Sequence, residues 1–268
     1  MLGSLILAVT IVAHDPGYNT SLANHIQRWL KDESISAKVV KPADMATAFK
    51  GEKIAFLVGF GAPTEAEMKE LISFRAAGGK LVVFHSASAK LAALMGVKSN
   101  GYLAAPYPGA WSCMCFKGEP FSGCPSTILQ TSGVLNRIEP INGRGKVIAT
   151  WADRRGKVSE EPVWVETDAG WWMSHVLTAD GDETLKSRLV AAMCGKVDPT
   201  LWNYAKHQER VKHEAEEVKA FASAQVSKKG EIHAVWDHSG CGLYPGNWPK
   251  TMRILRESHV TDLFVNVA

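Results

Sequence analysis

The sequence predicts an α/β fold built on a parallel sheet that helices cover on both faces. Its N-terminal part contains apolar runs rich in Val, Ile and Leu, in the segments MLGSLILAVTIVA, AKVVK, KIAFLVGFG and KLVVFHSAS. Strands of parallel sheets are buried on both faces and therefore form continuous apolar runs. Segments with the period of a helix separate the runs, and this alternation of strand and helix is typical of parallel sheets.

The N-terminal segment fits a strand better than a signal peptide. Its apolar stretch has the length of a signal-peptide core, but no Lys or Arg precedes it. We interpret it as the first strand and DPGYNT as the loop after it. The segment SLANHIQRWLKDE is then predicted to be a helix that Asn19 or Thr20 caps. Its apolar face consists of Leu22, Ile26, Trp29 and Leu30.

The segment PTEAEMKELISFRAAGG carries signals for both ends of a helix. Thr64 and Glu67 form a capping box at its start, and Gly78 and Gly79 end it. A strand, KLVVFHSAS, and a short helix, AKLAALMG, follow. The apolar face of the longer helix is expected to consist of Met68, Leu71 and Ile72.

The pattern is lost between Ser99 and Gly145, where Gly, Pro, Cys and aromatic residues dominate. We predict a long structured loop here, and such loops are often functional. Order returns with three predicted strands, KVIATWAD, EPVWVET and GWWMSHVLTAD, and with a helix in DETLKSRLVAAMCG. The apolar face of that helix is expected to consist of Leu185, Leu189, Ala192 and Met193.

Residues 198–229 are predicted to form a linker helix. Pro199 suits its first turn. Tyr204, Val211 and Val218 form a narrow apolar stripe on an otherwise charged helix, which is typical of a connection between domains. The expected organisation is therefore a first domain in residues 1–197, the linker in 198–229 and a second domain in 230–268.

The amino-acid composition limits the classes of molecule that the protein is expected to bind. Hydrophobic residues make up 46% and charged residues 21% of the chain, as in globular proteins. Lys and Arg number 30 and Asp and Glu 27, and the net charge of +3 gives no indication of nucleic-acid or membrane binding. No apolar run reaches the roughly 20 residues of a membrane span. We expect no nucleic-acid partner, no membrane span and no cofactor.

The segment SFRAAGGKLVVFHSAS resembles the class I glutamine amidotransferase-like fold, in which a helix, two glycines and an apolar strand lead to a sharp turn. Trehalose-utilisation proteins and the middle domains of some β-galactosidases share this fold. The later segment KVIATWADRRGKVSEEPVWVETDAGWWMSHVLTADGDE is similar to its closing strands. The resemblance covers residues 1–197 and implies a flavodoxin-like domain of three layers.

The segment EIHAVWDHSGCGLYPGNWPKTMRILRESHVTDLFVNVA resembles the opening of a glycosyl-hydrolase-like (β/α)8 barrel. EIHAVWDHSG would be the first strand and its loop, NWPKTMRILRESHV the first helix and TDLFVNVA the second strand. In the helix, Met252, Ile254 and Leu255 are expected to face inward. Because one βαβ unit cannot close a barrel of eight strands, this resemblance implies the N-terminal fragment of a larger, bacterial-type glycoside hydrolase.

Active glutamine amidotransferases place a cysteine nucleophile at the turn after the strand, where a His and a carboxylate activate it. Here the turn is FHSAS, so Ser86 takes the place of the nucleophile, and His85 or His175 could act as its base. Adjacent side chains point in different directions, however, and SHVLTADGDE lacks the His-x-Glu of the family. We favour a structural, non-catalytic domain, and a hydrolase or amidase that uses Ser86 is the alternative.

Cys113, Cys115 and Cys124 lie close together in CMCFKGEPFSGC. With a His they could bind zinc, although the spacing is not that of a standard knuckle. A disulfide from Cys124 to Cys113 or Cys115 in an exported protein, or free thiols, are the alternatives. The cellular location stays open, and export to the periplasm or outside the cell would place a signal peptide upstream of Met1.

Residues after barrel strands build the active face of (β/α)8 enzymes. Asp237 and His238 could therefore bind sugar hydroxyls, Tyr244 or Trp248 could stack on a sugar ring, and Asn266 would end the second strand at the same face. In the structural alternative, Asp237 caps a loop and Trp248 packs on the helix.

Glycoside hydrolysis normally uses two carboxylates, which barrels of this type take from later strands. We therefore expect carbohydrate as the substrate of the whole protein and no activity from this chain alone. The remaining alternative is a module for sugar binding or homo-oligomerisation that uses the aromatic residues between Tyr102 and Phe121.

Overall fold

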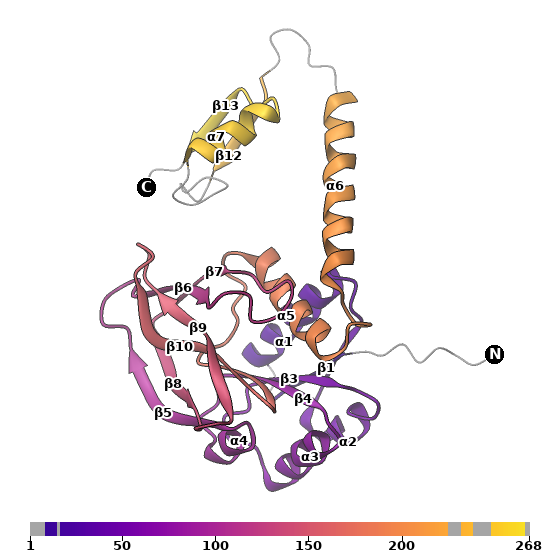
Figure 1. Ribbon diagram of the computed structural model, residues 1–268, viewed down its shortest axis with the longest axis vertical. Coiled ribbons are helices and arrows are strands. Elements are labelled where there is room, and N and C mark those ends of the chain that lie inside the picture. Colours follow the sequence, from indigo (N-terminus) through magenta and orange to yellow (C-terminus); the bar gives the residue numbers. More distant parts are fainter. Residues whose placement is uncertain (1–8, 15–16, 225–231, 238–247, 266–268) are drawn as a thin grey trace, which may run out of the picture. The chain divides into compact units, whose positions relative to one another are not determined.

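The computed structural model describes residues 9–14, 17–224, 232–237 and 248–265. The chain divides into two compact units, Met1–His207 (unit 1) and Gln208–Ala268 (unit 2) (Figure 1). Within the described ranges, no helix combines the length and the apolar character needed to cross a membrane.

Unit 1 contains a mixed sheet of nine strands in the order β2-β1-β3-β4-β11-β10-β9-β6-β7. The first five strands are parallel, and the order 2-1-3-4 is that of flavodoxin-like sheets. These five are β2 (Ala37–Val40), β1 (Val9–Ala13), β3 (Ile54–Val58), β4 (Lys80–Phe84) and β11 (Gly170–Met173). The antiparallel remainder is β10 (Val158–Thr167), β9 (Gly145–Ala152), β6 (Trp111–Phe116) and β7 (Thr127–Ser132).

Helices cover both faces of the parallel strands, which gives the three layers that the sequence predicts (Figure 1). Helices can pack on both faces because successive side chains of a strand point to opposite faces of the sheet and are apolar on both, as strand β3 shows. Phe56 belongs to the core that includes Trp29, whereas its neighbour Leu57 belongs to the core that includes Leu71. One face carries α1 (Tyr18–Asp32) and α5 (Glu183–Val197), and the other carries η1 (Pro42–Asp44), α2 (Met45–Ala48), α3 (Glu65–Ala76) and α4 (Ala89–Leu94).

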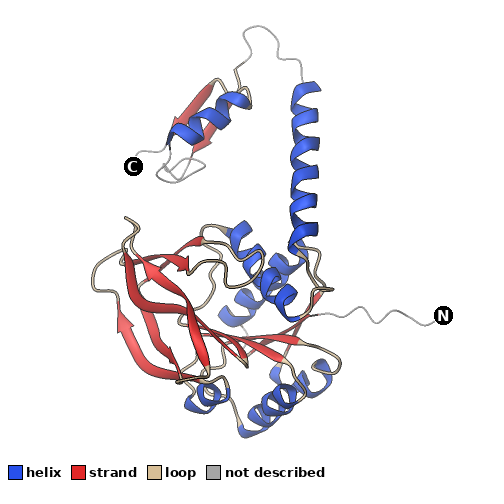
Figure 2. Cartoon of the chain, in the orientation of Figure 1, coloured by secondary structure: helices blue, strands red, loops and turns tan. Residues whose placement is uncertain are grey.

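The segment between Ser99 and Gly145, predicted as a long loop, is largely strand (Figure 2). Besides β6 and β7 it contains most of β5 (Val97–Ala104) and all of β8 (Val134–Pro140), which pair in a separate antiparallel ribbon. In β7, exposed and buried residues alternate along TILQTS, the period of a half-buried strand. The run is too short, and too closely surrounded by Gly, Pro and Cys, to stand out in the sequence.

Two helix details of unit 1 differ from the prediction, although the capping box of α3 is confirmed. Gly17 precedes α1 at the cap position, and Asn19 instead donates a hydrogen bond from Nδ2 to the backbone oxygen of His14, at 2.8 Å. On α3, Phe74 takes the buried place expected for Ile72, which is 51% exposed.

The predicted linker helix is shorter than residues 198–229. It is α6 (Tyr204–Ala224), which begins after Asn203, whose Oδ1 accepts hydrogen bonds from two backbone N–H groups of the first turn. Pro199 therefore lies before the helix and not in its first turn.

The described residues of unit 2 that follow α6 form a parallel βαβ unit of β12 (Ala234–Asp237), α7 (Trp248–Glu257) and β13 (Asp262–Val265), as predicted. On α7, Leu255 is buried as expected, but Met252 is 43% exposed, and Thr251 takes the buried place instead. These described residues form one βαβ unit and no barrel, since a barrel needs eight strands.

Candidate functional site

Four parallel strands of unit 1 end at the same edge of the sheet, and a polar or aromatic residue stands just after each. In open α/β sheets, ligands bind outside the carboxyl ends of the strands, at the point where the strand order reverses. The order 2-1-3 places that point between β1 and β3. The residues at this carboxyl edge are His14 after β1, Phe60 after β3, His85 after β4 and His175 after β11.

The turn after β4 has the backbone of a sharp elbow, and a histidine occupies it. His85 has a φ of 44°, in the left-handed region that is strained for a residue with a Cβ. Its ring centroid lies 5.4 Å from that of the exposed Tyr102. Burial lowers the pKa of His85 below its ordinary value of 6.5. The imidazole of His85 therefore occupies the strained position of the elbow, next to Ser86, for which the resemblance implies the place of the nucleophile.

Ser86 itself is fully buried, and its hydroxyl is engaged in structural contacts. The hydroxyl donates a hydrogen bond to the backbone oxygen of Phe60 and accepts one from the N–H of Ser88, at 3.1 Å. The Nδ2 atom of Asn136 donates to the Ser86 carbonyl at 2.8 Å. A hydroxyl that binds a carbonyl and has no exposed surface cannot attack a substrate, so this geometry favours a structural role for Ser86.

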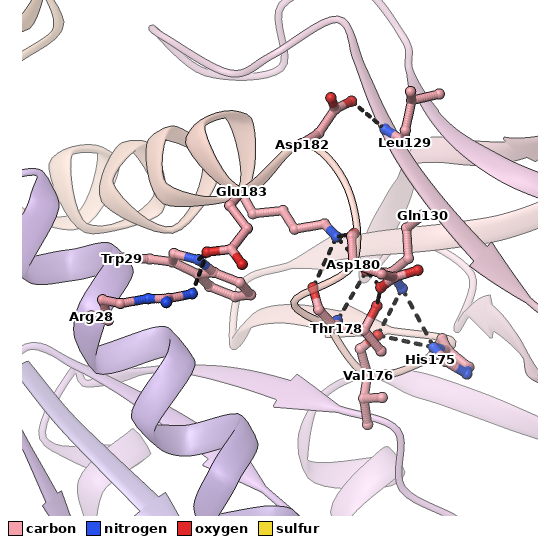
Figure 3. Close-up of polar contacts among 11 residues, drawn as sticks. Arg28, Trp29, Leu129, Gln130, His175, Val176, Thr178, Asp180, Asp182 and Glu183 are labelled. Carbon is pink, nitrogen blue, oxygen red and sulfur yellow. Dashed lines mark hydrogen bonds and ion pairs between the residues drawn. The ribbon is translucent and has the colours of Figure 1, made fainter. Parts of the chain in front are cut away.

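His175 is held by hydrogen bonds of the loop after β11 (Figure 3). Its Nδ1 lies 2.9 Å from the backbone oxygen of Val176, which can only accept, so Nδ1 carries the proton and Nε2 is left as an acceptor. Gln130 donates to the same oxygen at 2.8 Å and accepts from the N–H of Thr178 at 3.0 Å. Burial lowers the pKa of His175, and the nearby His85 lowers it further, against the opposing effect of the bond to Val176.

A buried lysine holds this loop from the side of α5. Lys186 is fully buried, and its Nζ donates hydrogen bonds to the backbone oxygens of Thr178, at 2.8 Å, and of Asp180. At the end of the loop, Asp182 accepts a hydrogen bond from the backbone N–H of Leu129, at 2.6 Å, which ties it to β7 (Figure 3). The position of His175 therefore depends on contacts with two separate elements.

Sequence reasoning missed a third imidazole at this edge, that of His14. Its Nε2 lies 3.1 Å from Oε1 of Glu67, whose other oxygen accepts the N–H of Thr64 in the capping box. The ring packs edge-on against Phe60, with 5.3 Å between the centroids. A polar residue directly after a buried parallel strand is the signal that could have identified His14.

The three cysteines of CMCFKGEPFSGC are free thiols, which is one of the three alternatives that the sequence left open. The Sγ atoms of Cys113 and Cys115 lie 3.9 Å apart, far beyond the roughly 2 Å of a disulfide, and Cys124 contacts the backbone oxygen of Pro125. Over the ranges that the structure describes, no three His, Cys, Asp or Glu side chains are grouped as metal ligands. Burial raises the pKa of both Cys113 and Cys124 to about 12.

We expect maleimide at pH 7.5 to modify Cys113 and Cys124 of the native protein far more slowly than the half-buried Cys115. The thiolate is the reactive form, and a thiol with a pKa of about 12 is almost wholly protonated at this pH. Mass spectrometry of peptides from a time course measures each site, and denaturant should equalise them. Equal native rates at Cys113 and Cys115 would contradict the placement of these side chains.

The other predicted site residues are only partly described. Asp237 ends β12 and Trp248 begins α7, and both are partly exposed. His238, Tyr244 and Asn266 lie outside the described residues. The aromatic residues proposed for sugar binding in unit 1 do not form one surface, because Trp111 and Phe121 are buried and Tyr102 and Tyr107 are exposed.

The fold is similar to those of several solved proteins. Gan42B, a GH42 β-galactosidase from G. stearothermophilus, matches 72% of this chain over 30% of its own, with a TM-score of 0.53 and 12% identity. Alpha-L-fucosidase isoenzyme 2 from Paenibacillus thiaminolyticus matches 73% of this chain over 34% of its own, with a TM-score of 0.55 and 16% identity. A ThuA-like protein from Bacteroides uniformis matches 72% of this chain over 93% of its own, with a TM-score of 0.52 and 11% identity.

No protein-family model matches the sequence, and no curated protein matches it. The chain spans about a third of the length of each of the two glycoside hydrolases. Identities of 11 to 16% show a shared fold and leave the activity open. The comparisons therefore support the expected resemblance to ThuA-like proteins and to part of a β-galactosidase in fold, and not in activity.

Proposed function

We propose that this chain is the leading part of a carbohydrate-active hydrolase, in which unit 1 is a non-catalytic domain and unit 2 begins a (β/α)8 barrel. The observation that supports the first half of this proposal is the turn after β4. His85 occupies the strained elbow position, and the hydroxyl of Ser86 is buried and hydrogen-bonded. A hydrolase of the amidotransferase type needs an accessible nucleophile at this turn.

The aromatic face of unit 2 supports the second half of the proposal. Trp236 and Phe264 are register partners in the two strands, their rings stack at 5.7 Å, and they are 63% and 52% exposed. Leu263 points to the opposite face, where it lines a small cavity with Leu255 of α7. In a (β/α)8 barrel the strand face that points away from the helix fills the barrel interior, where side chains this large and apolar are buried.

The substrate class of the proposal is carbohydrate. Two of the proteins with a similar fold are, by name, a β-galactosidase and an α-L-fucosidase. In the proposed barrel, Asp237 and Trp248 stand at the carboxyl end of the first strand and at the start of the first helix. Loops after barrel strands build the active face, so the proposed substrate contacts are these two with His238, Tyr244 and Asn266.

A panel of aryl glycosides tests the proposal. We expect the chain of 268 residues to release no aryl alcohol above the buffer rate, because the two carboxylates of glycoside hydrolysis are proposed to come from later barrel strands. Turnover that co-purifies with the chain would overturn the assignment, and its loss in Asp237→Asn would identify the site responsible.

The exposed aromatic face should also cause self-association. We expect Phe264→Lys and Trp236→Lys each to shift the chain toward monomer in sedimentation velocity and to reduce light scattering on storage, because charged residues block association through apolar strand faces. Ile72→Lys, at an exposed apolar position of unit 1, is the matched control and should change neither. An equal response of all three variants would contradict a special role for the Trp236–Phe264 face.

A further inference from the structure

A cavity of about 680 Å³ lies in unit 1 at the edge opposite to the candidate site, where the parallel strands begin. Lys80 and Gly170 are the first residues of β4 and β11, and Lys53 directly precedes β3. The volume falls within the range of roughly 300 to 1,000 Å³ that is typical of sites for small ligands. Two glycines of the wall, Gly78 and Gly143, have open space where a Cβ would stand, so the backbone there allows a close approach.

The wall of this cavity concentrates positive charge. It contains five cationic and two acidic side chains, an excess of three, which equals the net charge of the whole chain. Outside these seven residues the chain has 25 cationic and 25 acidic residues, since 30 minus 5 and 27 minus 2 are both 25. The cationic residues are Lys53, Lys80, Arg144, Lys146 and Lys196, and the acidic ones are Glu166 and Asp168.

The two carboxylates of the wall are too few for each of the five cations to have a carboxylate of its own. Glu166 is shared between Lys146, at 3.4 Å, and Lys196. Lys80 donates its hydrogen bond to the backbone oxygen of Asp168, at 2.7 Å, and not to a carboxylate. Lys146 therefore shares one carboxylate with a second cation, and the ammonium group of Lys80 contacts an oxygen that carries no full charge.

The remaining cations also keep access to the cavity. The Asp168 carboxylate serves two arginines, Arg75 at 3.4 Å and Arg144 at 3.8 Å. Lys53 pairs with Asp198 at 2.7 Å but is 57% exposed, and Arg144 is 43% exposed. Lysines and arginines that converge on one cavity form strong charge-assisted hydrogen bonds with phosphate, sulfate or carboxylate groups.

We propose that this amino-edge cavity binds a sugar-sized ligand that carries two or more oxyanion groups. The proposal goes beyond the proposed function, since it needs neither a barrel nor catalysis. The oxyanion groups could be phosphate esters or the sulfate and carboxylate groups of an acidic sugar. Both share the chemistry that the cavity wall recognises, and separate arms of the experiment distinguish them.

Isothermal titration calorimetry of the full chain tests the proposal with three probes: glucose 1,6-bisphosphate, a disulfated heparin disaccharide and maltose. We expect saturable binding of at least one of the two anionic probes and none of maltose. Lys80→Gln and Lys146→Gln should each weaken that binding about tenfold, equivalent to about 1.4 kcal/mol. Binding should also weaken as sodium chloride rises. Binding of only one anionic probe assigns the ligand to phosphate esters or to acidic sugars.

Lys98→Gln is the matched control, because Lys98 is 65% exposed, forms an ion pair with Glu139 and does not line the cavity. It should leave the affinity unchanged, and thermal melts should confirm that all variants fold. Lys80→Arg keeps the positive charge and should therefore retain most of the affinity that Lys80→Gln loses. The proposal is overturned if neither anionic probe binds, if maltose binds equally well, or if Lys98→Gln weakens binding as much as Lys80→Gln.

Discussion

Gly170→Ala should destabilise unit 1 by about 2 to 6 kcal/mol, from roughly 1 to 3 kcal/mol of backbone strain and a similar cost of overpacking. Gly170 has a φ of 130°, and a Cβ there would lie 2.0 Å from the backbone oxygen of Leu81. A backbone oxygen inside a sheet cannot swing away as a flexible side chain can. The substitution therefore opposes the pairing of β11 with β4, which brings His175 to the same edge as His85.

Gly156→Ala is the matched control for this substitution. Gly156 also has a positive φ, of 81°, but a Cβ there would meet no atom within 4 Å. Only the conformational cost of about 1 kcal/mol remains. Urea unfolding followed by tryptophan fluorescence measures both variants, and equal effects would contradict the close approach of β11 to β4.

Lys186→Met should destabilise unit 1 by about 2 to 4 kcal/mol, because it removes the charged donor of two partly buried backbone oxygens. The oxygens are those of Thr178 and Asp180, in the loop that positions His175. Met fills a volume similar to that of Lys, so the loss of stability measures the missing hydrogen bonds more than a change in packing. Hydrogen exchange of the segment from Val176 to Asp182 should accelerate more than exchange in β3.

Lys90→Met is the control, because Lys90 is 66% exposed and forms a surface ion pair with Glu65. Its effect should stay within about 0.5 kcal/mol. If exchange of the loop is unchanged in Lys186→Met, then the lysine does not anchor the loop.

The same lysine predicts a pH dependence with a definite sign. Burial lowers the pKa of Lys186 from its ordinary value of 10.5, and nearby acidic groups oppose that shift. Between the lowered pKa and 10.5, the unfolded chain holds a proton that the folded chain has released, so this group makes stability rise with pH in that window. Below the lowered pKa its contribution is constant. Lys186→Met should remove this rise from the curve of unfolding free energy against pH.

Local signals in the sequence predicted the helices and buried strands well. The capping box of Thr64 and Glu67 and the apolar strand from Ile54 to Val58 depend on neighbours in sequence, and the structure confirms both. Pairings between distant segments were not predictable in the same way. The ribbon of β5 and β8 joins residues 30 to 43 positions apart, from Ala104 with Val134 to Val97 with Pro140, and its register is set by contacts that no local pattern encodes.

In the candidate site, too, local features could be predicted from the sequence and contacts between distant segments could not. The sequence predicts a polar turn after the strand KLVVF, and the resemblance to glutamine amidotransferases singles out Ser86, with His85 or His175 as its base. Which residue takes the strained φ, and which is buried, depends on the Phe60 oxygen and on Asn136 of β8. The contact of His14 with Glu67 joins residues 53 positions apart, so no local pattern in the sequence predicts it.

Labelling with a serine-directed fluorophosphonate tests most directly the central claim that unit 1 has no nucleophile at the turn after β4. The native chain is incubated with the probe beside an active serine hydrolase as positive control, and peptides that contain residue 86 are examined by mass spectrometry. The buried, hydrogen-bonded hydroxyl of Ser86 predicts no modification above that of heat-denatured protein. Stoichiometric modification of Ser86 in the native chain, absent in Ser86→Ala, would contradict the claim and make unit 1 an enzyme.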